Sequence, residues 1–153
     1  MAFAITLHLL AAVIWVGGMF FAYMALRPVA GSLLESPVRQ TLWAGVFNRF
    51  FPWVWVCIAL LLITGFWMIF AYLGGMENVG IHVHIMLGLG ILMMMLFLHI
   101  YFAPYRRLKQ AIAENDWEMG AAKLNQIRIL IKTNLILGLV VVSIATAGRY
   151  WLS

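Results

Sequence analysis

Long apolar segments alternate with shorter stretches that hold most of the charged residues of this chain. A helix needs about 20 apolar residues to cross the hydrocarbon core of a bilayer, and each of the long segments is of that size. We predict helices over about 3–26, 49–73, 81–103 and 129–151. The pattern therefore predicts an all-α, antiparallel transmembrane four-helix bundle that forms a single domain over residues 1–153.

The composition excludes an ordinary soluble domain. Hydrophobic residues make up 65% of the chain and charged residues 10%, whereas soluble domains carry about 25% charged residues. The net charge of +5 does not indicate a nucleic-acid partner, because the basic residues flank apolar segments. The expected partner is the lipid bilayer.

The basic residues are unevenly distributed between the two ends of the predicted helices. Most of them lie in or beside the connections 27–48 and 104–128, while the opposite side has Arg149 and the acidic Glu77. Since cytoplasmic loops of membrane proteins are enriched in Lys and Arg, we expect both connections to be cytoplasmic. The first would contain a short interfacial helix, and the second a helix over about 111–128 that lies outside the hydrocarbon. Both termini would then lie on the external (periplasmic) side of a bacterial inner (plasma) membrane, in a multi-pass protein.

The histidines are the candidate functional residues, because a polar ring in lipid must face the protein interior or water. His8 in the first helix lies at a depth similar to that of His82 and His84 in the third. His99 lies about 22 Å farther along the third helix, and we interpret it as a capping or hydrogen-bonding residue.

His82 and His84 are separated by about 200° around their helix, so only one of them can face the bundle centre. We favour His84, because the small residue Gly88 follows it by one helical turn. His8 shares its helix face with Trp15 and Gly18. The small residues Gly18 and Gly88 would leave space for a cofactor.

Two histidines at one depth on different helices suit a flat macrocycle, and imidazole is a good axial ligand of haem iron. The first hypothesis is haem b with His8 and His84 as axial ligands, in contact with Trp15, Gly18 and Gly88. The alternative is a copper ion, for which thioether ligands are also suitable. Its histidine ligands would be His8 and His84, with His82 as a further candidate. Nearby methionines such as Met19, Met76 and Met86 could join them.

Other residues indicate packing rather than chemistry. Cys57 is the single cysteine, so no intrachain disulfide can form, and we interpret it as a buried structural thiol. Thr64-Gly65 in the second helix is typical of close contacts between membrane helices.

Three segments together resemble a known family. LHLLAAVIWVGGMFF, FNRFFPWVWVCIALLLITGFW and GIHVHIMLGLGILMMMLFLHIYFAPYRRL are similar to the copper-resistance D (CopD) family, whose helices carry a histidine ahead of W-x-G-G and a T-G in the next helix. The order of features also resembles HemJ-type protoporphyrinogen oxidases, which are haem-b membrane proteins. His8 matches their first-helix histidine, whereas His84 replaces the lysine of their His-x-Lys pattern.

The resemblance implies copper or haem. We expect a haem-b-binding inner-membrane protein acting in electron transfer or quinone-linked redox chemistry; if it is an enzyme, it would be a membrane oxidoreductase. Quinone, a redox partner protein or a second copy of the chain in a homo-oligomer are the expected partners besides lipid. The alternatives are copper binding or transport, and a non-catalytic subunit of a larger complex.

Overall fold

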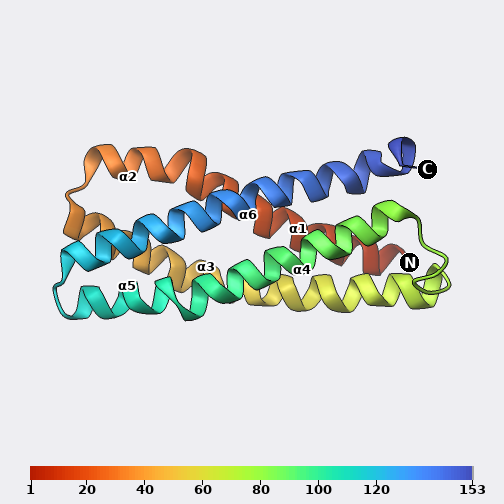
Figure 1. Ribbon diagram of the computed structural model, residues 1–153, viewed down its shortest axis with the longest axis horizontal. Helices are drawn as coiled ribbons and strands as arrows, with labels where there is room; N and C mark the ends of the chain where they lie inside the picture. Colours follow the sequence, from red (N-terminus) through yellow and green to blue (C-terminus); the bar gives the residue numbers. More distant parts are fainter. Residues whose placement is uncertain (153) are drawn as a thin grey trace.

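The structure is a computed structural model that describes residues 1–152. Figure 1 shows an elongated bundle in which the N-terminus and the C-terminus lie at the same end. Within the described residues the regular elements are helices: α1 (Ala2–Phe21), the π-helical segment η1 (Ala22–Leu26), α2 (Arg27–Leu33), α3 (Ser36–Trp67), the π-helical segment η2 (Met68–Tyr72), α4 (Ile81–Phe102), α5 (Pro104–Ala113) and α6 (Trp117–Trp151).

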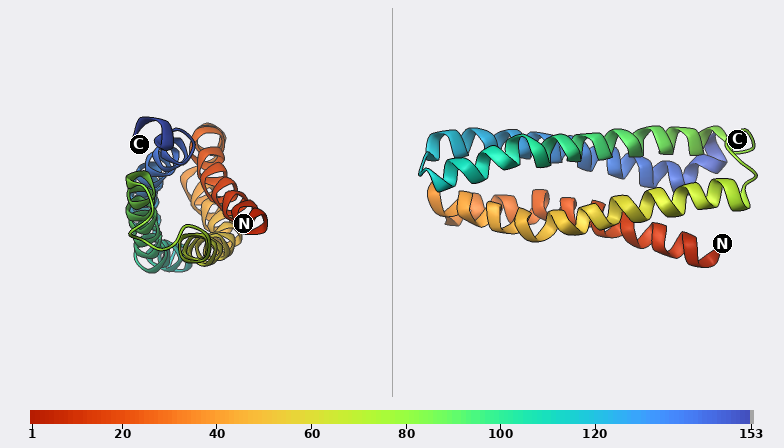
Figure 2. Two further views of the ribbon diagram at one scale, coloured as in Figure 1. Left: turned by 90° about the vertical axis from the view of Figure 1, so that its right-hand side faces the viewer. Right: turned by 90° about the horizontal axis from the view of Figure 1, so that it is seen from below.

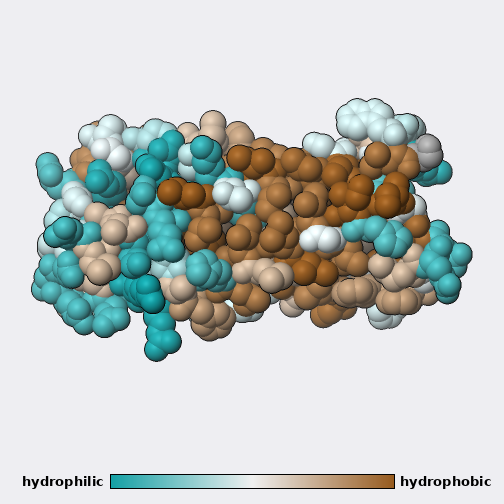
Figure 3. All heavy atoms as spheres, in the orientation of Figure 1, coloured by the Kyte–Doolittle hydropathy of each residue, from teal (hydrophilic) through white to brown (hydrophobic). Residues whose placement is uncertain are grey.

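These elements form four helical rods that are long and apolar enough to cross a membrane: Ala2–Leu33, Ser36–Tyr72, Ile81–Ala113 and Trp117–Trp151. The rods leave large apolar side chains exposed along their middle, as a lipid environment requires. Figure 3 shows this as a broad hydrophobic surface, with hydrophilic residues gathered over α2, α5 and the start of α6. The predicted all-α bundle of four spanning helices is confirmed.

The helices extend farther than the predicted spans. The stretches 27–48 and 104–128 connect the predicted spans and are largely helical, since they belong to α2, α3, α5 and α6. Helix was expected over about 111–128, whereas only a short helix was expected within 27–48. The helical rods are broken there only around Leu34–Glu35 and Glu114–Asp116. At the second break Asp116 caps α6, because its side chain accepts a hydrogen bond of 3.1 Å from the Met119 backbone N–H.

The helices pack in pairs. α1 lies along α3, and α4 and α5 lie along α6. Viewed from the end, α1, α3, α4 and α6 follow one another around the bundle, so that α1 and α4 face each other across it (Figure 2). We call the end with both termini and the α3–α4 connection the histidine end, because His8, His82 and His84 lie there. The opposite end, with α2 and α5, is called the basic end.

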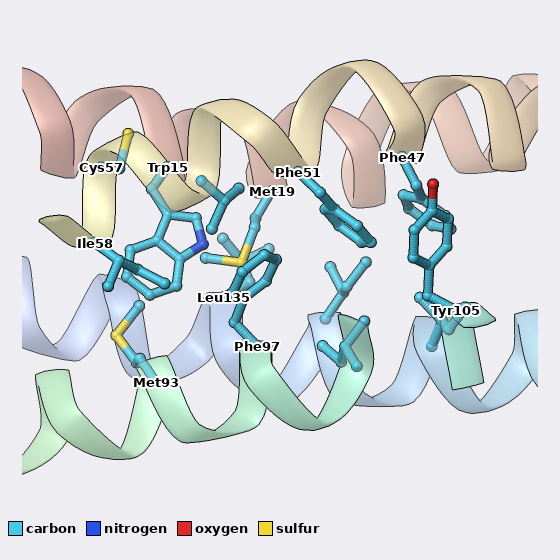
Figure 4. Packing of buried hydrophobic residues seen from close by; sticks show 14 of the residues in the cluster. Trp15, Met19, Phe47, Phe51, Cys57, Ile58, Met93, Phe97, Tyr105 and Leu135 are labelled. Atoms are coloured by element: carbon cyan, nitrogen blue, oxygen red, sulfur yellow. The ribbon is translucent and has the colours of Figure 1, made fainter. Parts of the chain in front are cut away.

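Aromatic rings fill the core between the middle of the bundle and the basic end (Figure 4). The Phe51 ring stacks on Phe47 at 4.9 Å between centroids. It meets the ring edges of Tyr105 at 4.9 Å and Phe97 at 5.3 Å. Offset and edge-to-face pairs of this kind are favourable beyond the area they bury. This cluster therefore joins α3, α4 and α5 into one rigid unit.

The histidine end contains few buried residues. In the stretches 2–10, 59–92 and 136–152 the buried positions are Thr64, Ile69, Gly138 and Gly148. Two of these four are glycines and one is polar, so this end has little apolar core of its own. The helices are therefore held together at this end by a few individual contacts.

Candidate functional site

His8 and Thr64 form a polar contact between α1 and α3 near the histidine end. His8 Nδ1 lies 2.8 Å from Thr64 Oγ1. The His8 side chain is half-buried, whereas Thr64 is 5% exposed. Because hydrogen bonds to intramembrane polar groups have few competitors in lipid, this pair fixes the direction in which the imidazole points.

The hydrogen-bond chain assigns the proton on the imidazole. Thr64 Oγ1 also lies within hydrogen-bond distance of the Leu60 backbone oxygen, which can only accept. A hydroxyl has one hydrogen to donate. Thr64 therefore donates to Leu60 and accepts from His8, so Nδ1 of His8 carries its hydrogen. In the neutral ring Nε2 then has a free lone pair, and this is the arrangement of a histidine prepared to bind a metal.

Gly65 provides the space that the imidazole occupies. A Cβ atom at Gly65 would lie 3.3 Å from His8 Cε1 and 3.8 Å from His8 Nδ1. Any side chain there would press on the ring. The Thr64-Gly65 pair thus has two functions, since the threonine orients His8 and the glycine accommodates it.

His82 and His84 are placed differently from each other. The His82 side chain is half-buried against α6, where a Cβ atom at Gly148 would come within 3.0 Å of His82 Cβ. His84 is exposed, and its Nδ1 lies 3.3 Å from the Gly80 backbone oxygen of its own helix. The residue packed between two helices is therefore His82 and not His84, although His84 was favoured on the basis of Gly88.

Trp15, Gly18 and Gly88 are not gathered around His8. Trp15 is buried in the core, with its ring 6.4 Å from Phe97. A Cβ atom at Gly18 would overlap the ring of Phe50, so Gly18 allows the close contact between α1 and α3. Gly88 is exposed and has open space around it. Trp15 and Gly18 stabilise helix packing in this structure, and their role toward a cofactor stays a prediction.

The described residues contain no group of three or more His, Cys, Asp or Glu side chains close enough to hold a metal ion. Cys57 is buried within the apolar core, as expected for a structural thiol. His99 is exposed in the last turn of α4, away from the other histidines. A metal at the histidine end would thus depend on His8 and on further ligands such as thioethers.

Sequence reasoning identified His8 but missed its partner. Thr64 was interpreted as a helix-contact residue, because threonine is neither a usual metal ligand nor a titratable group at neutral pH. A depth comparison would have found it: His8 lies about 9 Å inside the start of α1, and Thr64 lies about 12 Å inside the end of η2 at the same end of the bundle.

Comparison with known protein families gave one match. The family described as copper resistance protein D matches residues 44–147. The match includes Thr64, His82 and His84, and it begins after His8. A search of curated proteins and a search of solved structures gave no match. Since the family match covers more than half of the chain and the fold has four membrane-spanning helices, the protein is a multi-pass inner-membrane protein that belongs to the CopD family.

Proposed function

We propose that the protein binds copper near the histidine end and that Nε2 of His8 is one of the copper ligands. The observation that carries this proposal is the hydrogen bond from His8 Nδ1 to Thr64, which leaves Nε2 with its lone pair. Imidazole binds copper well, and thioether ligands suit Cu(I). Membership of a copper-resistance family supports copper as the ion. The protein would hold or pass copper within the membrane.

The second candidate is haem b with His8 and His84 as axial ligands. The observation that favours it is that His84 Nδ1 faces a backbone oxygen, which can only accept a hydrogen bond. The free nitrogen of neutral His84 is therefore Nε2, as in His8. Haem would supply one-electron chemistry, and quinone or a redox partner protein would exchange electrons with it. The chain's own residues would hold the iron and set the orientation of each imidazole.

The test is metal analysis and absorption spectroscopy of the purified protein, oxidised and reduced. We expect copper at a fixed stoichiometry in the wild type and its loss in His8→Ala. His99→Ala is the matched control, because His99 is an exposed histidine far from the site, and it should leave copper unchanged. His82→Ala and His84→Ala identify the second ligand.

Each outcome has a distinct meaning. A Soret band that disappears in both His8→Ala and His84→Ala would replace copper by haem. Copper that persists in His8→Ala would refute the proposed ligand. A folded wild type without copper or haem after expression in the presence of both would refute both candidates and leave a non-catalytic subunit of a larger complex, in which the histidines serve packing.

A further inference from the structure

A cavity of about 330 Å³ lies at the basic end, between the first helical rod, α3 and α6. Arg27, Arg39 and Arg128 line it from three different segments, and no Asp or Glu lines it. Three guanidinium groups without a neutralising carboxylate create a strongly positive site. Such a site favours an anion, and its size is within the range of small-molecule sites.

The arginines have donors to spare. The Arg27 guanidinium carbon lies 4.4 Å from the centre of the Tyr23 ring, and its Nε donates to the Tyr23 backbone oxygen at 3.2 Å. Arg39 Nη1 lies 3.4 Å from the backbone oxygens of Gly31 and Leu34. A guanidinium has five N–H donors. The remaining donors can bind an anion, and the planar fork of arginine matches the two oxygens of a phosphate group.

The cavity also has an apolar side. Trp43 and Phe47 line it from α3, and both belong to the buried core. An occupant with a charged head and an apolar remainder fits both surfaces. A fully hydrated inorganic anion would contact only the arginine side of the cavity.

The position along the bundle agrees with a lipid. The cavity lies where the apolar surface gives way to the hydrophilic surface over α2 and the start of α6 (Figure 3). Phospholipid headgroups occupy this level in a bilayer, and basic pockets between membrane helices bind acidic headgroups. We infer that this cavity binds the phosphodiester headgroup of an acidic phospholipid, with Arg27, Arg39 and Arg128 as its phosphate ligands. This inference is independent of the copper site.

The experiment is native mass spectrometry of the purified protein with an equimolar mixture of phosphatidylglycerol and phosphatidylcholine that have identical acyl chains. We expect the wild type to retain phosphatidylglycerol in clear preference. The double variant Arg27→Gln/Arg128→Gln should lower this preference about thirtyfold. Arg106→Gln/Arg107→Gln is the matched control, because both residues are exposed on α5 and the charge change is the same.

Two further measurements complete the test. Arg27→Lys/Arg128→Lys keeps the charge and should keep part of the preference, and thermal unfolding shows whether each variant is folded. In a second measurement, excess inorganic phosphate is added to the protein and the lipid mixture, and the retained species are compared. Equal losses in the cavity variant and in the α5 control would overturn the site. Binding of inorganic phosphate without any preference for phosphatidylglycerol would overturn the lipid as its source.

Discussion

The two ends of the bundle are built on different principles. Toward the basic end, aromatic rings such as Phe47, Phe51 and Tyr105 are packed against one another and almost fully buried. At the histidine end the described part of α4 has no buried residue before Met93. There, the helices are held together by a hydrogen bond and by close approach at a few glycines, and not by densely packed side chains. The basic end is therefore held by dense aromatic packing, and the histidine end by a few individual contacts.

This difference shows where substitutions should affect stability and where they should affect binding. Dense packing makes the aromatic cluster sensitive to lost volume. The His8–Thr64 contact has little apolar packing around it, so its loss should change a site more than a fold.

The largest effect is expected from Phe51→Ala. It removes a ring that is 3% exposed and packs against four other aromatic rings. We expect a loss of about 3–5 kcal/mol in the free energy of unfolding, as for other buried aromatic residues. Unfolding in mixed detergent micelles measures it. The control is Phe66→Ala, because Phe66 is 40% exposed near the histidine end; an equal loss there would contradict the comparison.

The second effect is expected from Thr64→Val. Valine has the shape of threonine but cannot accept the hydrogen bond from His8, so the imidazole loses its fixed orientation. Loss of such a supporting contact typically lowers metal affinity about 10–100-fold. Copper titration measures it, and nitrogen-15 NMR of the metal-free protein reports the position of the His8 proton.

Thr64→Ser is the control for this prediction, because serine retains the hydroxyl. It should bind copper like the wild type and keep the proton on Nδ1. Unchanged affinity in Thr64→Val together with an unchanged nitrogen-15 spectrum would show that Thr64 does not orient His8.

A smaller effect is expected from Gly65→Ala. The added Cβ atom would lie 3.3 Å from His8 Cε1, so the ring must move by a few tenths of an ångström. Copper affinity should fall a few-fold, while the free energy of unfolding should not decrease because alanine favours the helix by about 1 kcal/mol. Gly17→Ala is the control, since nothing lies within 4 Å of its added Cβ. A drop in affinity in both variants would point to a general effect.

The smallest effect is expected from Asn134→Leu in the packed part of the bundle. Asn134 is 1% exposed and donates from Nδ2 to the Met93 backbone oxygen at 3.2 Å, but its Oδ1 has no partner among the described residues. Interhelical hydrogen bonds in membranes average about 0.6 kcal/mol, so the free energy of unfolding should change by about that much or less. A loss several times larger would reveal a partner for Oδ1.

The sequence was sufficient for the architecture. Apolar length determines how many helices can span a membrane, because a run of about 20 apolar residues can satisfy its own backbone hydrogen bonds in lipid as an α-helix. The sequence did not predict how far each spanning helix continues into 27–48 and 104–128. There the residues are polar enough to leave the hydrocarbon yet still form helices, which hydropathy alone does not distinguish.

Of the candidate site, the sequence predicted His8 but not its hydrogen-bond partner. His8 could be selected because an intramembrane imidazole is rare, but its partner depends on how α1 and α3 rotate against each other. Gly18 against Phe50 helps to fix that rotation, and no single helix reveals such a contact. For His82 and His84, angular separation showed that they differ, while the packing of His82 on Gly148 decided which one faces α6.

The π-helical segment η1 links the two sites proposed for the first rod. Arg27 follows His8 by nineteen residues, which in an unbroken α-helix would turn it about 100° away from His8. A π-helical turn accommodates one additional residue without additional rotation, so Ala22–Leu26 restores an integral number of turns. The imidazole and the guanidinium consequently share one face. A one-residue deletion within η1 would convert it into α-helix and preserve this alignment, whereas the same deletion anywhere between His8 and Gly18 would destroy it.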